Sequence, residues 1–140
     1  MITYVDTSTL LKRLLEEDGS ARADIIWEAA DVLASAAMVV VEARAALAAA
    51  ERAGRLTDGE HRVAKAGLID LLEEVAIVEI TDDLVAVAAD LAEQEALRGY
   101  DAMHLAAAVT VQAQVLTSSD LALCAAAERR GLHVANPVEG

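Results

Sequence analysis

The sequence predicts an α/β fold of three layers, in which helices cover both faces of a short parallel β-sheet. Apolar segments of strand length alternate with longer segments of helical period along the chain. Strands that are joined through helices run parallel and need cover on both faces. The 140 residues, of which 56% are hydrophobic, suit one domain with a buried core. With a single proline and no Gly/Ser-rich linker, residues 1–140 are expected to form one domain.

The N-terminal half is expected to hold two strands and four helices. Residues 1–5 form an apolar strand, and leucines at helical spacing predict a helix that ends near Asp18-Gly19. Apolar patterns then predict a helix at 21–30, a short strand at 32–35 and helices at 39–53 and 57–72. Gly54 suits the end of the third helix. Thr57 and Glu60 have the spacing of a capping box, which indicates where the fourth helix begins.

The C-terminal half continues the alternation. A strand is expected at 75–80, and Thr81 caps a helix that Gly99 breaks. Another helix begins near Asp101, followed by a strand at 114–117. The last helix starts at 118–120 and ends at Gly131, and residues 132–135 form the last strand. In such a sheet, ligands bind beyond the carboxyl ends of the strands, where the strand order reverses.

Composition and charge argue against membrane, exported and nucleic-acid-binding proteins. The most apolar segment, residues 34–50, carries Glu42 and Arg44, so no membrane-spanning helix is expected. No basic leader precedes an apolar run, and the single Cys124 cannot form an internal disulfide, so a cytoplasmic protein is expected. The formal net charge of -13 argues against a nucleic-acid binder. That objection falls only if some acids bind metal, or if a basic partner covers the acidic surface.

Asp6 and Asp120 share one context. Each follows a predicted strand and precedes a predicted helix, beside hydroxyl residues that could cap the helix instead. Capping remains an alternative role for Asp6, although Ser8 and Thr7 make it dispensable for that purpose. If the two strands are neighbours, both carboxylates stand at the same edge of the sheet.

Glu42 lies on an apolar face of its predicted helix. Its neighbours one turn away on either side are apolar, and Arg44 points elsewhere. A carboxylate in such a place costs several kcal/mol, on the order of 2–7, unless a cation, a raised pKa or solvent offsets the loss of hydration. A solvated position at the edge of the apolar stripe is the alternative.

Asp101 stands at a helix start, where the helix dipole favours an acid, so capping is again the alternative role. His104 lies one turn on and is expected to orient the Asp101 carboxylate rather than to bind metal. Taken together, the carboxylates Asp6, Glu42, Asp101 and Asp120 suit Mg²⁺, for which Mn²⁺ can substitute. The lone cysteine and the lack of paired histidines argue against zinc.

At these residues the sequence resembles the PIN-domain family, and within it the VapC-like toxins of toxin–antitoxin pairs. The resemblance spans nearly the whole chain in the expected order. The matching segments are YVDTSTLLK (residues 4–12), VVEARAAL (40–47), RGYDAMHLAAA (98–108), LTSSDLAL (116–123) and RGLHVANP (130–137). The acidic residues of the family correspond to Asp6, Glu42, Asp101 and Asp120. Ser8 and Ser118 match supporting hydroxyl positions. Leucine and alanine stand where some relatives carry a further acid after the fourth, which argues against a well-occupied second metal site.

The resemblance implies a Mg²⁺-dependent endoribonuclease that hydrolyses RNA with water and leaves a 5′-phosphate. It would be the toxin of a toxin–antitoxin pair that inhibits translation. The ion would lower the pKa of water and clamp the phosphate, with Asp6 and Asp101 as principal ligands and Glu42 and Asp120 acting directly or through water. A homodimer and a basic antitoxin segment are also expected. RNA contacts outside the metal would fall to a few basic side chains in or near the matched segments, namely Lys12, Arg13, Arg44 and Arg98, although each is expected to be an ordinary solvated side chain.

Other function classes fit less well. A phospho-receiver domain needs a lysine at the end of a late strand, whereas Lys12 and Lys65 lie in predicted helices. A haloacid-dehalogenase-like phosphatase needs a second aspartate where Ser8 stands. A catalytically inactive PIN-like module that only binds a partner or RNA remains the main alternative.

Overall fold

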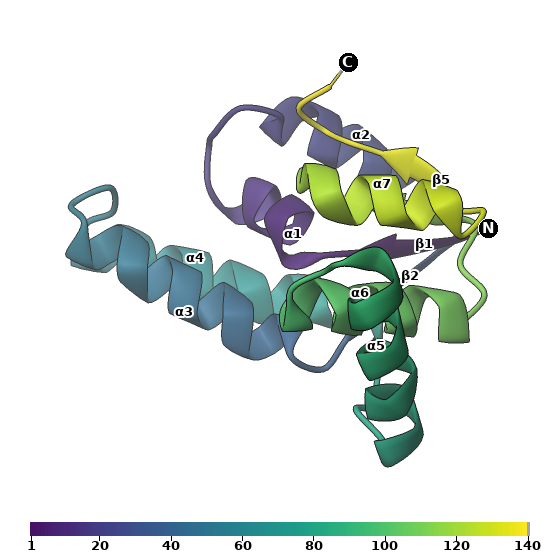
Figure 1. Ribbon diagram of the computed structural model, residues 1–140. Coiled ribbons are helices and arrows are strands. Elements are labelled where there is room, and N and C mark those ends of the chain that lie inside the picture. Colours follow the sequence, from purple (N-terminus) through teal and green to yellow (C-terminus); the bar gives the residue numbers. More distant parts are fainter. Residues whose placement is uncertain (140) are drawn as a thin grey trace.

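The computed structural model describes residues 1–139, which form alternating strands and helices (Figure 1). The strands are β1 (Ile2–Val5), β2 (Val32–Ala36), β3 (Val75–Val78), β4 (Val115–Thr117) and β5 (His133–Ala135). The helices are α1 (Thr7–Leu14), α2 (Ser20–Ala29), α3 (Val39–Arg52), α4 (Asp58–Leu72), α5 (Asp82–Glu95), α6 (Gly99–Thr110) and α7 (Leu121–Arg129). Within the described residues, no helix has the length and apolar character needed to cross a membrane.

The sheet is parallel throughout, with the strand order β3-β2-β1-β4-β5. Strands β2 and β3 lie on one side of β1, and the later strands β4 and β5 lie on the other side. The strand order therefore reverses between β1 and β4, whose pairing aligns Val5 with Thr117. Asp6 and Ser118 follow these two residues, so the β1 and β4 ends place both at the switch point where open α/β sheets bind ligands.

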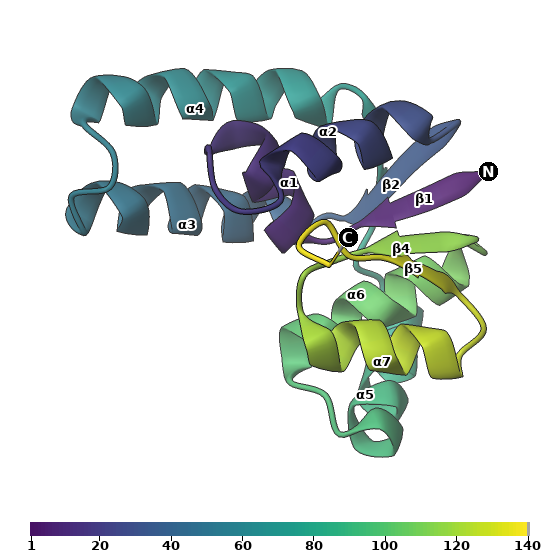
Figure 2. The same ribbon diagram turned by 90° about the horizontal axis from the view of Figure 1, so that it is seen from above.

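Two apolar cores lie on opposite faces of the sheet, which confirms the three-layer α/β/α prediction. On one face, Tyr4 and Leu116 pack against α5, α6 and α7. On the other, Val5 and Leu33 pack with Leu10 and Trp27 from α1 and α2, and with residues of α3 and α4. The two groups of helices stand on either side of the sheet when the molecule is seen from above (Figure 2). The α3–α4 hairpin projects from the body at the end of the sheet where α1 begins.

The expected capping box is present at the start of α4, where the Thr57 side chain accepts from Glu60 N and the Glu60 side chain accepts from Thr57 N. Thr81 caps α5, as predicted. The sequence left open whether Asp6 and Asp120 or the hydroxyl residues beside them cap the helices. In the structure the two aspartates accept the N-cap hydrogen bonds, from Thr9 N and Leu123 N.

Three predicted boundaries are wrong. Helix α1 ends at Leu14 rather than near Gly19, because Leu15 is extended and its carbonyl accepts from the Ser20 hydroxyl. Gly99 does not break α5 but is the first residue of α6. Helix α5 ends at Glu95, because the next residue, Ala96, has a left-handed φ of 52°. Strand β3 ends at Val78, two residues before the predicted end.

Candidate active site

Asp6 is the first residue after β1 and is 5% exposed. Its Oδ1 accepts hydrogen bonds from the Ser8 hydroxyl at 2.6 Å and from Thr9 N at 3.2 Å. Its Oδ2 accepts from the Ser118 hydroxyl at 2.6 Å, across the β1–β4 switch point. Burial raises the pKa of Asp6, and these hydrogen bonds oppose that rise. Capping α1 therefore uses only part of this carboxylate, since Oδ2 is held by the neighbouring strand end.

Asp120 and Asp101 meet at the guanidinium of Arg98, which is an exposed side chain at the N-cap of α6. Arg98 Nη2 lies 3.4 Å from Asp120 Oδ2 and 3.6 Å from Asp101 Oδ2. Asp101 is in the first turn of α6 and is not its N-cap. Burial raises the pKa of Asp101, and the charges of Asp120 and Asp6 raise it further, while Arg98 lowers it. Repulsion among three carboxylates therefore acts at this edge, and the exposed Arg98 offsets part of it.

Glu42 lies in the first turn of α3 and is joined to the same edge through Thr7, the residue after Asp6. Its Oε1 accepts hydrogen bonds from the Thr7 hydroxyl and from His104 Nε2, both at 2.8 Å. Burial raises the pKa of Glu42, but the bonds from His104 and Thr7 outweigh it, so the pKa is lowered overall. Glu42 is therefore neither unpaired on an apolar face nor fully solvated at its edge. Its carboxylate is half-buried, and hydrogen bonds from α1 and α6 offset the lost hydration.

His104 was expected to orient Asp101. The structure contradicts this, because both ring nitrogens have other partners: Tyr4 at Nδ1, 2.6 Å away, and Glu42 at Nε2. His104 is 2% exposed and packs edge-on against the Tyr4 ring. His104 lies three residues after Asp101 on α6, which suggested a contact between them. The His104 ring instead points into the core, where it meets Tyr4.

The donor chemistry of this edge fits a hard divalent cation. Every charged candidate ligand is a carboxylate, which is the ligand type that Mg²⁺ and Mn²⁺ prefer. Their mutual repulsion gives a cation a favourable place to bind. Within residues 1–139, no three His, Cys, Asp or Glu side chains stand close enough together to form a ready-made ligand cage. The carboxylates are instead held by hydroxyl groups, by Arg98 and by helix N-termini.

The sequence matches the PIN domain family over residues 3–129. The chain belongs to the PIN-domain family. Ribonucleases VapC45 and VapC49 of Mycobacterium tuberculosis are each 39% identical to it over 110 residues, which cover 79% of this chain and 76% of the relative. The resemblance drawn from the sequence motifs is thereby confirmed.

Solved structures agree on the fold of this PIN domain. FitAcB from Neisseria gonorrhoeae superposes with a TM-score of 0.76 at 19% identity, over the full length of both chains. A chain of a toxin–antitoxin complex from Klebsiella pneumoniae gives a TM-score of 0.69 at 18% identity, covering 96% of this chain and 97% of that one. At these identities the likeness concerns the fold alone.

Two basic residues of this PIN domain were misjudged as solvated. Lys12 is buried, and its Nζ lies 3.3 Å from the Ser119 hydroxyl, 3.2 Å from Glu17 Oε1 and 3.4 Å from Ser8 O. Arg13 pairs with Asp24 and lies over the Trp27 ring. The sequence did not predict the contact of Tyr4 with His104 or that of Thr7 with Glu42. The sequence offered only one indication of these contacts, a polar group on the apolar strand (Tyr4) and another directly after Asp6 (Thr7).

Proposed function

We propose that this protein is a Mg²⁺-dependent endoribonuclease, the toxin of a toxin–antitoxin pair that inhibits translation in the cytoplasm. The proposal rests chiefly on the placement of Asp6 and Asp120 after the neighbouring strands β1 and β4, at the edge where their charges both raise the pKa of Asp101. Glu42 is tied to the same edge through Thr7. The ribonuclease names of the 39% identical relatives support RNA as the substrate.

Each side chain has a role in this proposal. Asp6 and Asp101 are the principal ligands of Mg²⁺, and Asp120 and Glu42 bind directly or through water. The ion supplies Lewis acidity and a clamp for the phosphate. Ser8 and Ser118 hold the two oxygens of Asp6. Arg98 is 83% exposed at its side chain, so it can leave its carboxylates and contact a substrate phosphate.

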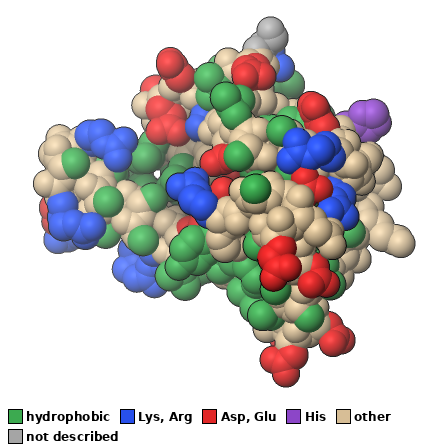
Figure 3. Space-filling model, viewed as in Figure 1, with side chains coloured by type: hydrophobic (Ala, Val, Ile, Leu, Met, Phe, Trp, Pro, Cys, Tyr) green, Lys and Arg blue, Asp and Glu red, His purple; other side chains and the backbone are tan. Residues whose placement is uncertain are grey.

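The charge distribution reduces the objection raised by the acidic composition. Five basic and five acidic residues lie between 39 and 72, so the α3–α4 hairpin is neutral and the net charge of -13 resides in the rest of the chain. In Figure 3, Lys and Arg side chains gather over the projecting hairpin, and acidic side chains lie over α5. RNA would meet the least repulsion by approaching along the hairpin side of the site.

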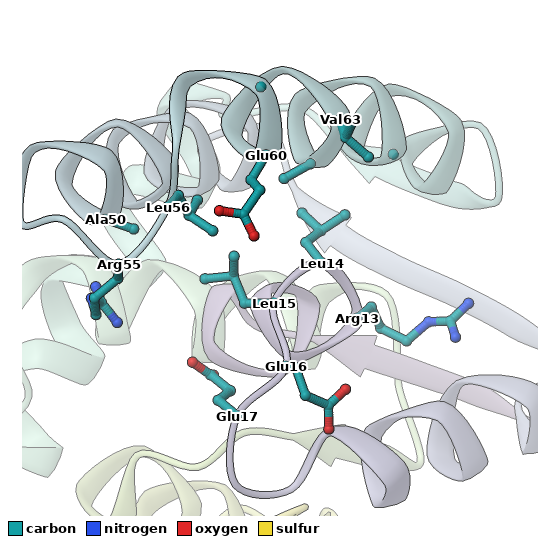
Figure 4. Close-up of a pocket in the computed structure, with 13 residues that line it drawn as sticks. Arg13, Leu14, Leu15, Glu16, Glu17, Ala50, Arg55, Leu56, Glu60 and Val63 are labelled. Atoms are coloured by element: carbon teal, nitrogen blue, oxygen red, sulfur yellow. The ribbon is translucent and has the colours of Figure 1, made fainter.

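An antitoxin segment has a suitable place beside this hairpin. A cleft of about 1000 Å³ separates the end of α1 and the following loop from the α3–α4 hairpin. Leu14, Leu15 and Val63 are apolar lining residues, whereas Glu16, Glu17 and Glu60 are acidic ones (Figure 4). Two basic residues line it too, Arg13, which is paired with Asp24, and Arg55, so the three acids outnumber the two basic residues. An apolar segment with basic residues complements this lining, and we assign that segment to the cognate antitoxin.

A homodimer is part of the proposal. Exposed apolar side chains from the start of α5 and of α6, among them Val85 and Tyr100, form an apolar surface with Ile80. Val85→Glu should shift the protein to monomer in sedimentation equilibrium. A Val85→Glu protein with unchanged mass would remove this surface as the dimer contact.

The central experiment incubates purified protein with total RNA, with and without Mg²⁺, and maps the cut ends. Cleavage should need Mg²⁺ or Mn²⁺ and stop with EDTA. Cleavage that persists in EDTA would point to another chemistry. The alternative, a catalytically inactive PIN-like binding module, predicts no cleavage and no Mn²⁺ binding that depends on Asp101. Calorimetric titration of Mn²⁺ into wild type and Asp101→Asn separates the two.

The antitoxin cleft has its own test. Val63 is 75% exposed in the cleft, so Val63→Lys adds a charge that repels basic residues without disturbing the core. This variant should cut RNA like wild type but escape inhibition by the cognate antitoxin. Ile69→Lys is the matched control, because Ile69 is also exposed on α4 and does not line this cleft. Equal inhibition of both variants would place the antitoxin elsewhere.

A further inference from the structure

A chain of buried hydrogen bonds runs from the sheet interior to one carboxylate of the site. Tyr4, fully buried on β1, accepts a hydrogen bond at its hydroxyl from Ala36 N over 3.0 Å. The same hydroxyl lies 2.6 Å from His104 Nδ1. His104 Nε2 lies 2.8 Å from Glu42 Oε1. Three residues from β1, α6 and α3 are thus linked in one line that ends at the carboxyl edge.

The hydrogen-bond partners indicate where the protons lie along this line. A fully buried phenol keeps its proton at neutral pH, because the ordinary pKa of tyrosine is about 10. With Ala36 N–H donating to the hydroxyl oxygen, the phenol proton has His104 Nδ1 as its acceptor. Nδ1 is then unprotonated, and the ring carries its proton on Nε2. That N–H donates to Glu42 Oε1.

The two carboxylate oxygens of Glu42 differ in their hydrogen bonds. Oε1 accepts from both Thr7 and His104, whereas Oε2 makes no hydrogen bond within residues 1–139. Both nitrogens of His104 are occupied by protein partners, so the ring cannot also bind a metal ion. Any buried imidazole needs partners at both ring nitrogens, and here one of those partners is a carboxylate at the edge of the site.

We propose that Tyr4 and His104 are positioning residues for the carboxylate site, in which Tyr4 sets the tautomer of His104 and His104 holds Glu42 by Oε1, leaving Oε2 for the divalent cation or water around it. This rests on the proposed nuclease function. Partners of this kind, one step away from a metal, orient the ligands that touch it, and losing one costs about 10–100-fold in metal affinity or activity.

A pair of substitutions at His104 separates positioning from packing. In His104→Gln, the side-chain amide reaches about as far as Nε2 and can still donate to Glu42. In His104→Asn, the shorter amide can face Tyr4 but cannot reach Glu42. Both remove the ring from the core. We expect Mn²⁺ affinity and the cleavage rate to fall about 10-fold or more in His104→Asn and by only a few-fold in His104→Gln.

Loss of stability needs its own control, because Tyr4→Phe and both His104 variants disturb a buried network. Leu68→Ala makes a cavity in the opposite core and touches none of these residues. Its Mn²⁺ affinity, measured well below its melting temperature, should equal that of wild type. Tyr4→Phe, which keeps the ring and removes only the hydroxyl, should weaken Mn²⁺ binding while its fold remains.

Nitrogen-15 NMR of the imidazole rings tests the tautomer without any metal. The protein has three histidines, so His104→Gln assigns the His104 signals by their disappearance. Wild type should show His104 protonated at Nε2 and not at Nδ1, and Tyr4→Phe should lose that preference. A His104 ring protonated at Nδ1 in wild type would overturn the proposal.

The outcomes distinguish this proposal from the nuclease function on which it rests. Wild type that binds Mn²⁺ and cuts RNA, with equal losses in His104→Gln and His104→Asn, would overturn the positioning role and leave the nuclease standing. Wild type that neither binds Mn²⁺ nor cuts RNA would overturn both. Losses confined to His104→Asn and Tyr4→Phe, with the Nε2 tautomer in wild type, would support the proposal.

Discussion

Ser118 donates its hydroxyl proton to Asp6 Oδ2 over 2.6 Å, and this bond ties the end of β4 to the end of β1. The two residues are 112 positions apart in the sequence. The Ser118 hydroxyl also accepts from Asp120 N at 3.0 Å. One buried hydroxyl thus links two of the four candidate carboxylate positions.

Ser118→Ala should therefore weaken both the fold and the site. It leaves a buried Asp6 oxygen without this donor, which costs about 1–3 kcal/mol of unfolding free energy. Cleavage should fall about 10-fold, as for other partners of metal ligands. Ser20→Ala is the control, because it removes a buried hydroxyl bonded to Leu15 O, away from the carboxylates. The two free energies come from urea unfolding. If both variants lose activity alike, Ser118 has no special role.

Asp101→Asn should abolish cleavage while the apo protein keeps or gains thermal stability. The swap preserves shape and removes one charge from mutually repelling carboxylates. Metal should stabilise wild type far more than the variant, since a ligand raises stability through binding the folded state. Melting temperatures of both proteins, with EDTA and with Mn²⁺, give the comparison. Asp83→Asn, at an exposed position on α5, should respond to Mn²⁺ like wild type.

Without metal, the stability advantage of Asp101→Asn over wild type should decrease as the pH is lowered. The pKa of Asp101 is raised in the folded protein, so the folded state holds its proton to a higher pH than the unfolded chain does. Wild type therefore loses stability as pH rises from the ordinary aspartate value through the raised one. The advantage of the variant should be complete at neutral pH and should shrink on acidification. Urea unfolding in EDTA across this range measures it, and an advantage that grows at low pH would contradict the argument.

Lys12→Met should lower the free energy of unfolding by about 1–2 kcal/mol. Methionine keeps much of the buried stem but loses the contacts of Nζ with Glu17, Ser119 and Ser8 O. Lys65→Met, at an exposed position on α4, should change stability little. Chemical unfolding of both proteins provides the measurement. Equal stabilities would mean that the buried contacts of Lys12 contribute nothing net.

Cys124 should resist alkylation in the folded protein. It is 7% exposed, its thiol donates to Ser118 O, and burial raises its pKa to about 11. At pH 8 only about one thiol in a thousand is then the reactive thiolate. Iodoacetamide should modify the chain slowly until urea unfolds it, as followed by mass spectrometry. Rapid modification of folded protein would show that this part of α7 opens readily.

The sequence by itself determined the fold class, the family and most of the elements. Alternating periods of strand and helix are local signals, and so are the Thr57–Glu60 capping box and the Thr81 cap, all of which the structure confirms. The aspartates after β1 and β4 could be placed at one sheet edge once those strands proved to be neighbours. That step needed only the rule that parallel strands end at the same edge.

Tertiary structure decided the partners of the candidate site residues. His104 binds Glu42, 62 positions away, rather than the nearby Asp101, and Lys12 reaches Ser119 across 107 positions. Periodicity reports which face of a helix is buried, but not which polar group from another element meets it there. Hydrogen-bond partners so distant in sequence depend on how α1, α3 and α6 pack around the sheet. A polar side chain that looked solvated, like Lys12, is buried because packing supplied it with acceptors.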